Sequence, residues 1–214
     1  MAPKTAYSIF FAILGLPSAF AAPRAIALPQ DVAGMQGSAS APQCATTGKG
    51  KLTITCTYTA ASRDGADSRT SPRILLNGAV ISFNPSDESY LSVDLTFTND
   101  SGSEIGGGRD VYLAIDDPRG ENHMRRRLPH VDFTKLEPGK ATKFQDVMLA
   151  PAFAPGDYLV SLWIPSSDPS LKFDAAHDLL LTSAGVADPA TGLNRIAKFT
   201  VVAIARRRSG AKLN

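Results

Sequence analysis

Apolar and polar side chains alternate strictly over residues 90–99, with the period of two that a half-buried β-strand requires. The apolar set on one side of this run is Leu91, Val93, Leu95 and Phe97. Residues 51–59 alternate in the same way, with threonines on the opposite side. No segment keeps a helical period over ten residues or more. We therefore expect a chain built from strands.

Pro-Gly and Asn-Gly pairs separate further short β-branched and aromatic runs along the chain. One run, residues 157–164, holds the single tryptophan, Trp163, and a last run covers residues 196–204. Residues 74–83 are interrupted by an Asn-Gly pair, and we expect one bulged strand there, because a hairpin would leave a very short first arm. The pattern predicts an all-β, immunoglobulin-like antiparallel β-sandwich of about seven or eight strands over residues 72–204.

The first 21 residues have the three parts of a secretory signal peptide. Lys4 supplies the positive charge, residues 7–16 form a short apolar stretch, and residues 19–21 fit the small-x-small cleavage rule. The apolar stretch is too short to span a bilayer, so we expect a secreted, extracellular protein with no membrane span. Residues 22–43, rich in small residues and proline, are expected to be a flexible N-terminal segment or a propeptide.

The two cysteines, Cys44 and Cys56, are close in sequence and lie after the signal peptide. In an oxidising compartment such a pair is expected to form one disulfide, which would stabilise the fold by about 3 kcal/mol in the chain-entropy model. Two free buried thiols are the alternative. Residues 44–71 are therefore expected to be a disulfide-tethered strand and loop, packed on the edge of the sandwich.

Two runs of three arginines lie at residues 125–127 and 206–208. They suit either an anionic glycan, phosphate or nucleic acid, or a solvated loop and a disordered basic tail at residues 205–214. The formal net charge is only +2, which favours the second interpretation. We therefore expect no nucleic-acid partner.

A group of acidic residues and a histidine, close in sequence, offers two interpretations. Its members are Asp110, Asp116, Asp117, Glu121 and His123. Their oxygens suit Ca²⁺, but the spacing is not that of an EF-hand, and Asp-Pro sequences are typical of turns. Turn chemistry is preferred, and we expect neither a metal nor another cofactor. The histidines lie in polar segments and no G-x-S-x-G elbow occurs, so catalysis is not expected.

A glycosylation sequon, Asn99-Asp100-Ser101, directly follows the most regular strand. Sequons in loops of secreted proteins are often used, so Asn99 is predicted to carry a glycan.

Aromatic side chains supply the candidate binding surface. Trp163 has the opposite parity to Tyr158 in its strand, so it is either a platform for a ligand on the outer face or a core residue. If it is a platform, Trp163 or Tyr112 is expected to form the surface together with the loop residues Asp116, Asp117 and Arg119.

Several motifs in order resemble a β-sandwich domain of unknown function that usually follows a glycosidase-like barrel in secreted bacterial and fungal proteins. They lie at residues 111–113, 116–119, 155–158, 162–165, Leu171 and 190–194. The resemblance covers roughly residues 72–202 and implies a sugar-rich setting. The roughly 50 residues upstream are too few for a barrel, so the barrel's catalytic role is not carried over.

Together these observations predict a secreted, non-catalytic module that binds carbohydrate or another extracellular surface. The alternatives are a secreted hydrolase related to glycosidase-associated proteins, and a structural or host-directed secreted protein without a small ligand.

Overall fold

The computed structural model describes residues 41–48, 50–61, 71–117 and 119–202. The predictions for the signal peptide and the basic tail lie outside the described residues, as does most of the segment 22–43. No helix in the described part of the chain is long and apolar enough to cross a membrane.

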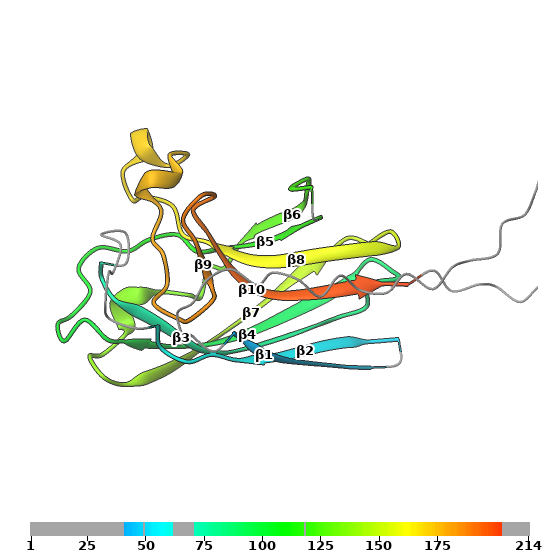
Figure 1. The fold of residues 1–214 in the computed structure, drawn as a ribbon, viewed down its shortest axis with the longest axis horizontal. Helices are drawn as coiled ribbons and strands as arrows, with labels where there is room; N and C mark the ends of the chain where they lie inside the picture. The colour runs from blue at the N-terminus through cyan, green and yellow to red at the C-terminus, as the bar shows by residue number, and fades with distance from the viewer. Residues whose placement is uncertain (1–40, 49, 62–70, 118, 203–214) are drawn as a thin grey trace, which may run out of the picture. The chain divides into compact units, whose positions relative to one another are not determined.

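Two antiparallel sheets of five strands each form a sandwich, which confirms the predicted fold class (Figure 1). The first sheet has the order β1 (Gln43–Thr47), β2 (Leu52–Thr57), β3 (Ile74–Phe83), β4 (Ser89–Asn99) and β7 (Ala141–Ala150). The second has the order β6 (Asn122–Arg127), β5 (Tyr112–Asp116), β8 (Gly156–Trp163), β10 (Leu193–Val201) and β9 (Ala187–Asp188). Eight of these strands, β3 to β10, lie within residues 72–204, as predicted, and the disulfide-tethered segment adds β1 and β2.

The strand order is that of an immunoglobulin-like domain. Strands β3, β4 and β7 correspond to A, B and E, while β6, β5, β8 and β10 correspond to C′, C, F and G. Tyr158, at the start of β8, donates its hydroxyl proton to the carbonyl of Ala154, 2.9 Å away and four residues upstream. This is the tyrosine corner that marks strand F in such domains.

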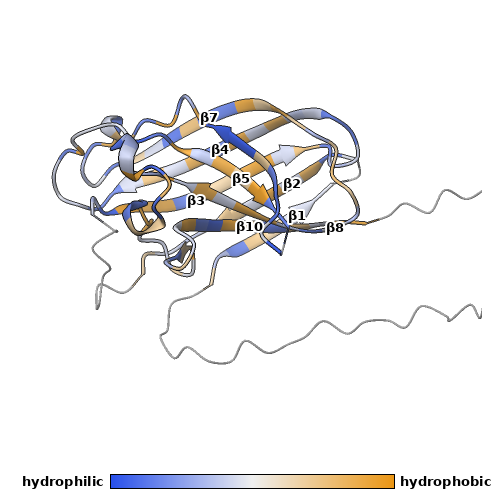
Figure 2. Cartoon of the chain, turned by 90° about the horizontal axis from the view of Figure 1, so that it is seen from above, coloured by the Kyte–Doolittle hydropathy of each residue, from blue (hydrophilic) through white to orange (hydrophobic). Residues whose placement is uncertain are grey.

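The core lies between the sheets, where the inward residues of each strand meet. The four apolar residues predicted to point inward from β4 are all at most 1% exposed. Phe83, Phe153, Tyr158 and Phe199 interlock at one end, with ring centroids 5.1–5.6 Å apart. Strand β3 is continuous and its register shifts between Leu76 and Gly78, so the predicted bulged strand is confirmed. Figure 2 shows the hydrophobic positions recurring along the strands.

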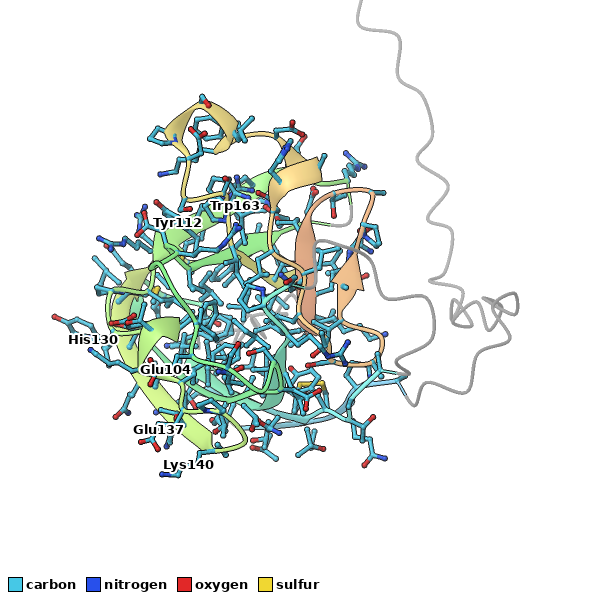
Figure 3. The ribbon with its side chains drawn as sticks, turned by 90° about the vertical axis from the view of Figure 1, so that its left-hand side faces the viewer. Glu104, Tyr112, His130, Glu137, Lys140 and Trp163 are labelled. Atoms are coloured by element: carbon cyan, nitrogen blue, oxygen red, sulfur yellow. A yellow bond between two sulfur atoms is a disulfide. The ribbon has the colours of Figure 1, made fainter. Side chains whose placement is uncertain are left out.

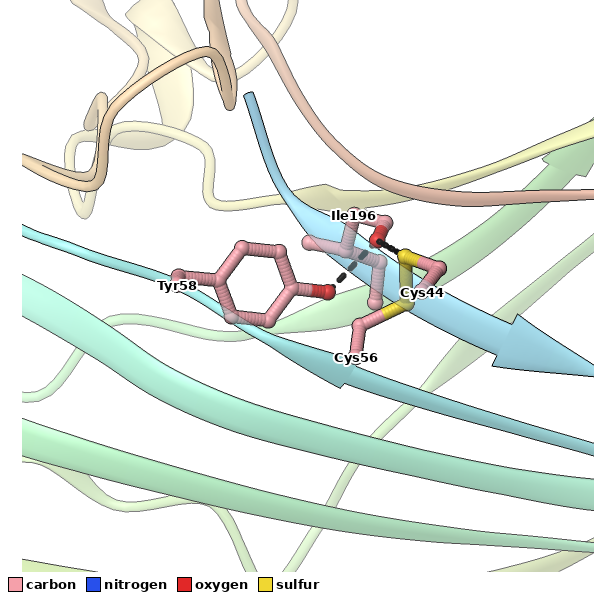
Figure 4. The surroundings of a disulfide bond; sticks show 4 residues. All are labelled: Cys44, Cys56, Tyr58 and Ile196. Carbon is pink, nitrogen blue, oxygen red and sulfur yellow. Dashed lines mark hydrogen bonds between the residues drawn. A yellow bond between two sulfur atoms is a disulfide. The ribbon is translucent and has the colours of Figure 1, made fainter. Parts of the chain in front are cut away.

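The predicted disulfide joins Cys44 of β1 to Cys56 of β2, at directly paired positions (Figure 4). The segment does lie at the edge of the sandwich, but β2 pairs with β3 over six residues and so belongs to the first sheet. Tyr58 donates a 2.5 Å hydrogen bond to the carbonyl of Ile196 in β10. Burial raises the pKa of the Tyr58 phenol, which keeps this donor protonated. The Cys44 Sγ lies 3.9 Å from the same oxygen but, being in the disulfide, has no proton to donate.

Residues 179–186, named here the bridging segment, connect the two sheets on the side of the sandwich where Tyr58 bonds to Ile196. The N–H of Leu179 donates to Ile164, and the N–H of Thr182 to Ile74, each over 2.8 Å. Ser183 fills the β3 bulge, since its hydroxyl accepts from the N–H of Leu76 and donates to the Leu76 carbonyl. The sequence predicted only a short apolar run at its start.

Strand β6 was not expected, because the preferred interpretation of the arginine run at residues 125–127 is a solvated loop. It contains Arg125, Arg126 and Arg127, so that arginine run lies on a strand and not in a loop. The alternation is hidden because β6 is an edge strand, where a side chain on the inward side still reaches solvent. Of its six residues, only Met124 is buried.

Candidate functional site

The loop that follows β8, residues 165–178 and named here the cap loop, lies against the outer face of the second sheet (Figure 1). It contains two short 3-10 helices, η3 (Pro169–Leu171) and η4 (Ala175–His177). Asp168 and Asp174 cap them by accepting the N–H of Ser170 and of Ala176. The Ser170 hydroxyl, which donates to the same Asp168 oxygen, and then the Ser170 N–H lower the pKa of the Asp168 carboxyl. The N–H of Ala176 is the main cause that lowers the pKa of Asp174, so both caps stay ionised at neutral pH.

Arg109 attaches the cap loop at both of its ends. Its Nη1 donates to the carbonyl of Pro165 at 3.1 Å and to that of His177 at 3.3 Å. The loop is therefore anchored by hydrogen bonds from Arg109, which precedes β5, as well as by its own caps.

Trp163 lies at the end of β8 and on its outer side, so it is not part of the core between the sheets (Figure 3). It is nevertheless only 7% exposed. Its Nε1 donates to Asp178 Oδ2 at 3.0 Å, Tyr112 lies beside it at 5.0 Å between ring centroids, and the Arg125 guanidinium covers its ring at 4.9 Å. Trp163 is therefore neither an open platform nor a residue of the core between the sheets. It belongs to a second, small group of packed side chains on the outer face.

Phe173 covers this layer. Its ring stacks on Trp163 with an interplanar angle of 22° and a centroid separation of 6.0 Å, while 86% of the residue remains exposed. It is the most exposed large hydrophobic residue in the described part of the chain. The aromatic face available to a ligand is therefore that of Phe173 and not that of Trp163.

Polar groups surround Tyr112 next to this ring. The Tyr112 hydroxyl donates to Asp110 Oδ2 at 3.2 Å and accepts from Lys172 Nζ at 3.1 Å. Arg127 pairs with the other oxygen of Asp110 at 2.8 Å. An open hollow of about 280 Å³ lies here, lined by Gly108, Asp110, Pro165, Ser166, Ser167, Pro169 and Lys172. We call Phe173, Tyr112 and this hollow the cap surface.

Asp178 lies beneath the cap surface, where it accepts the hydrogen bond from Trp163. It is 3% exposed, and its Oδ1 has no hydrogen-bond partner among the described residues. Burial raises the pKa of this carboxyl, and the hydrogen bond from Trp163 opposes that rise. Gly192 lies against it with φ at +71°, and a Cβ there would come within 2.3 Å of Asp178 Oδ2. This position in the motif at residues 190–194 therefore requires glycine for the backbone conformation and for the space.

The other residues predicted for the binding surface lie elsewhere. Asp116 is 6% exposed at the far end of β5, and burial raises the pKa of its carboxyl. Asp117 accepts the N–H groups of Arg119 and Glu121 on Oδ1, each at 2.9 Å, and so orders the β5–β6 turn. At about 3.3 Å per residue, this turn is roughly 13 Å or more along the strand from Tyr112. The structure therefore does not bring the predicted set together.

The same turn contains the metal-ligand types considered in the sequence. One ligand atom each of Asp117, Glu121 and His123 lies within 4.8 Å of the others. Two backbone hydrogen bonds already engage Asp117 Oδ1, and Glu121 and His123 are exposed. The observed contacts of Asp117 are those of the turn interpretation.

The geometry of Asn99 argues against the predicted glycan. Asn99 is fully buried, and its Nδ2 donates to the carbonyls of Ser103 and Leu136. Its Oδ1 accepts from the N–H and the hydroxyl of Ser101. A sugar on Nδ2 would replace one of these donors and would have no room, so the folded domain offers no attachment site at this sequon.

Sequence reasoning missed Lys172 and the exposed role of Phe173. The available signal was the pair of Asp-x-Ser and Asp-x-Ala turns around them, which predicts an ordered loop but not its position. A scan against protein-family models finds no match, and neither does a search of curated proteins or of solved structures. The functional argument therefore rests on the site itself.

Proposed function

We propose that this protein is a secreted, non-catalytic recognition module that binds an extracellular carbohydrate through the cap surface. The observation that carries the proposal is Phe173, an almost fully exposed ring held parallel to a buried tryptophan. An exposed aromatic ring is unfavourable in water, and a ring fixed by a rigid loop loses little entropy when a ligand stacks on it.

The polar groups beside the ring suit a polyhydroxyl ligand. Lys172 is a donor, Asp110 is an acceptor, and Ser166 and Ser167 can act as either. A flat apolar face next to mixed donors and acceptors is the arrangement that a sugar ring requires, with its apolar C–H face and its hydroxyl rim.

The absence of catalysis is part of the proposal, and the contacts of the acidic residues support it. Asp110 is engaged by Tyr112 and Arg127, and Asp178 by Trp163. Asp168 and Asp174 cap the two short helices. The acidic residues named here each have a structural partner, whereas glycoside hydrolysis requires two carboxyl groups facing a scissile bond.

Secretion, which the proposal includes, rests on the signal-like N-terminus and is supported by the disulfide.

Retention of the purified protein on cellulose, chitin and β-glucan, followed by calorimetry with soluble fragments of the polysaccharide that retains it, tests the function. Phe173→Ala should weaken binding about tenfold, since that corresponds to about 1.4 kcal/mol of lost stacking. Tyr90→Ala is the matched control, because Tyr90 is also an exposed aromatic residue, at 75%, but lies on the first sheet.

Retention by none of these polysaccharides would refute the carbohydrate proposal in favour of a protein partner. Equal losses in the two variants would show that the cap surface is not the site. Phe173→Ala should change the free energy of unfolding by less than about 0.5 kcal/mol, as for other exposed positions.

A further inference from the structure

The side of the sandwich opposite the bridging segment is formed by two edge strands. In the described part of the chain, β6 pairs only with β5, and β7 only with β4. Between them lies a groove of about 480 Å³, named here the side groove, lined by residues of both sheets. Its lining is Glu88, residues 122–126 and residues 149–151.

The β7 rim of this groove is apolar and exposed. Val147 is 60% exposed and Leu149 49%, and they share one face of β7. Tyr90, 75% exposed, is the direct partner of Leu149 in the β4–β7 register. These three residues form one continuous patch. Exposed apolar residues that adjoin on an edge strand are typical of a surface that binds another chain.

The opposite rim is cationic. Arg125 and Arg126 line the side groove, against the single acidic residue Glu88. The Arg125 guanidinium lies over Trp163, so Arg126 is the cation available to a ligand. No carboxylate of the described residues forms an ion pair with Arg126. A run of arginines on an edge strand also discourages pairing between copies of the chain, because the second copy would bring the same charge.

The backbone of β7 adds a third recognition element. An edge strand of an antiparallel sheet directs alternate N–H and C=O groups away from its partner. The loop after β6 reaches β7 at Asp146, whose carboxylate accepts the N–H of His130 and contacts its ring. Beyond this contact, Leu149 and Ala150 at the end of β7 line the side groove, and Val147 precedes them on the same edge strand.

We propose that the side groove binds an extended acidic peptide segment of a partner protein, which adds as a strand to β7 at residues 147–150. Its apolar side chains pack on Val147, Leu149 and Tyr90, and its carboxylates reach Arg126. Main-chain hydrogen bonds provide affinity in this mode, while the alternate side chains provide specificity. The site is independent of the cap surface, which lies on the outer face of the second sheet.

A titration of the ¹⁵N-labelled protein with a capped Glu-Val-Glu-Val-Glu-Val peptide, up to about 1 mM, tests the proposal by NMR. Amide shifts should move at residues 122–126 and 147–150. A Lys-Val repeat of the same length should bind at least about tenfold more weakly, because its charge is repelled. The acidic peptide with N-methylated backbone should also lose binding, because it cannot add as a strand.

Substitutions test the contribution of charge to peptide binding, with a check that each variant is folded. Arg126→Glu should weaken the acidic peptide about tenfold and strengthen the Lys-Val peptide, with a well-dispersed spectrum as proof of folding. Lys198→Glu, an exposed charge reversal on β10, is the matched control and should leave both affinities unchanged. Leu149→Thr should weaken binding of the acidic peptide but leave it bound more tightly than the Lys-Val peptide.

Three results would overturn the proposal. They are no shift with the acidic peptide at the highest concentration, equal binding of the N-methylated peptide, or shifts confined to residues outside the side groove. A dimer without peptide that Val147→Lys dissociates would assign the edge to a second copy of the chain instead.

Discussion

The two sides of the sandwich differ in how the edges of the two sheets meet. On the closed side, the bridging segment bonds to both sheets and Tyr58 of one sheet bonds to Ile196 of the other. On the open side, β6 and β7 leave a groove between them. The closed side contains buried polar groups that are mostly hydrogen-bonded, although the Thr182 hydroxyl has no partner among the described residues, whereas the open side presents charged and exposed side chains.

This difference indicates that the closed side contributes to stability and that the open side is available for binding. Buried hydrogen-bonded groups are costly to disturb, because a lost partner leaves another group unsatisfied in the interior. Exposed edge residues are cheap to change, so they are available for binding. Substitutions on the closed side should therefore change the free energy of unfolding, and those on the open side should not.

The largest expected effect is that of Asn194→Ala. Asn194 is fully buried, accepts the N–H of Leu181 and donates to the carbonyls of Leu179 and Leu162. Its loss removes three buried hydrogen bonds to backbone groups and should cost about 3–4 kcal/mol in urea unfolding. Asn122→Ala on exposed β6 is the matched control and should cost less than about 0.5 kcal/mol. Similar costs for the two variants would remove the distinction between the sides.

Removal of the disulfide should have the next largest effect. Cys44 and Cys56 are separated by 12 positions. Reduction should lower the free energy of unfolding by about 3 kcal/mol in the chain-entropy model. The double variant Cys44→Ala/Cys56→Ala should show the same loss and no response to reductant. Intact mass should shift by two hydrogens on reduction, and an unchanged unfolding midpoint would contradict the stabilising role.

Tyr58→Phe should cost about 1–2 kcal/mol, because the Ile196 carbonyl loses a buried donor while the ring and its packing remain. Tyr90→Phe on the open side, where the residue is 75% exposed, should cost almost nothing. Thermal and chemical unfolding of both variants provides the comparison. A larger cost at Tyr90 would show that the open side is already covered in the isolated protein.

The smallest effect concerns pH. Burial raises the pKa of Asp116, at the end of β5, above its usual value of 3.8. The folded state then holds this proton more tightly than the unfolded state, so stability from this group is present at low pH and is lost as pH rises through the raised pKa. Asp116→Asn should therefore be more stable than wild type at about pH 7, and the gain should disappear near about pH 3. A gain that persists at low pH would assign the effect to packing.

Much of the fold could be predicted because strand periodicity is local. The alternation in β2 and β4, the bulge in β3 and the disulfide between β1 and β2 follow from residues close in sequence. Strand β6 could not be predicted, because an edge strand with three consecutive arginines shows no alternation. The bridging segment was missed because its partners in β3, Ile74 and Leu76, lie far from it in the sequence.

The candidate site was predictable only in part. The parity of β8 places Trp163 on the outer face, which the structure bears out. Whether that face is open depends on the cap loop, and no local pattern indicates that Phe173 covers it. In the same way, the sequon at Asn99 is a local pattern, while the carbonyls of Ser103 and Leu136 that bury its amide are brought together by the fold.

The sequence by itself determined an all-β sandwich, its inward and outward residues and a disulfide at its edge, because side-chain alternation and turn chemistry act over a few residues. Only the tertiary structure decided which outer face is covered, which edge is closed and which aromatic ring meets solvent. Those outcomes depend on the cap loop and the bridging segment, which are held by hydrogen bonds to residues distant in the sequence rather than by their own propensities.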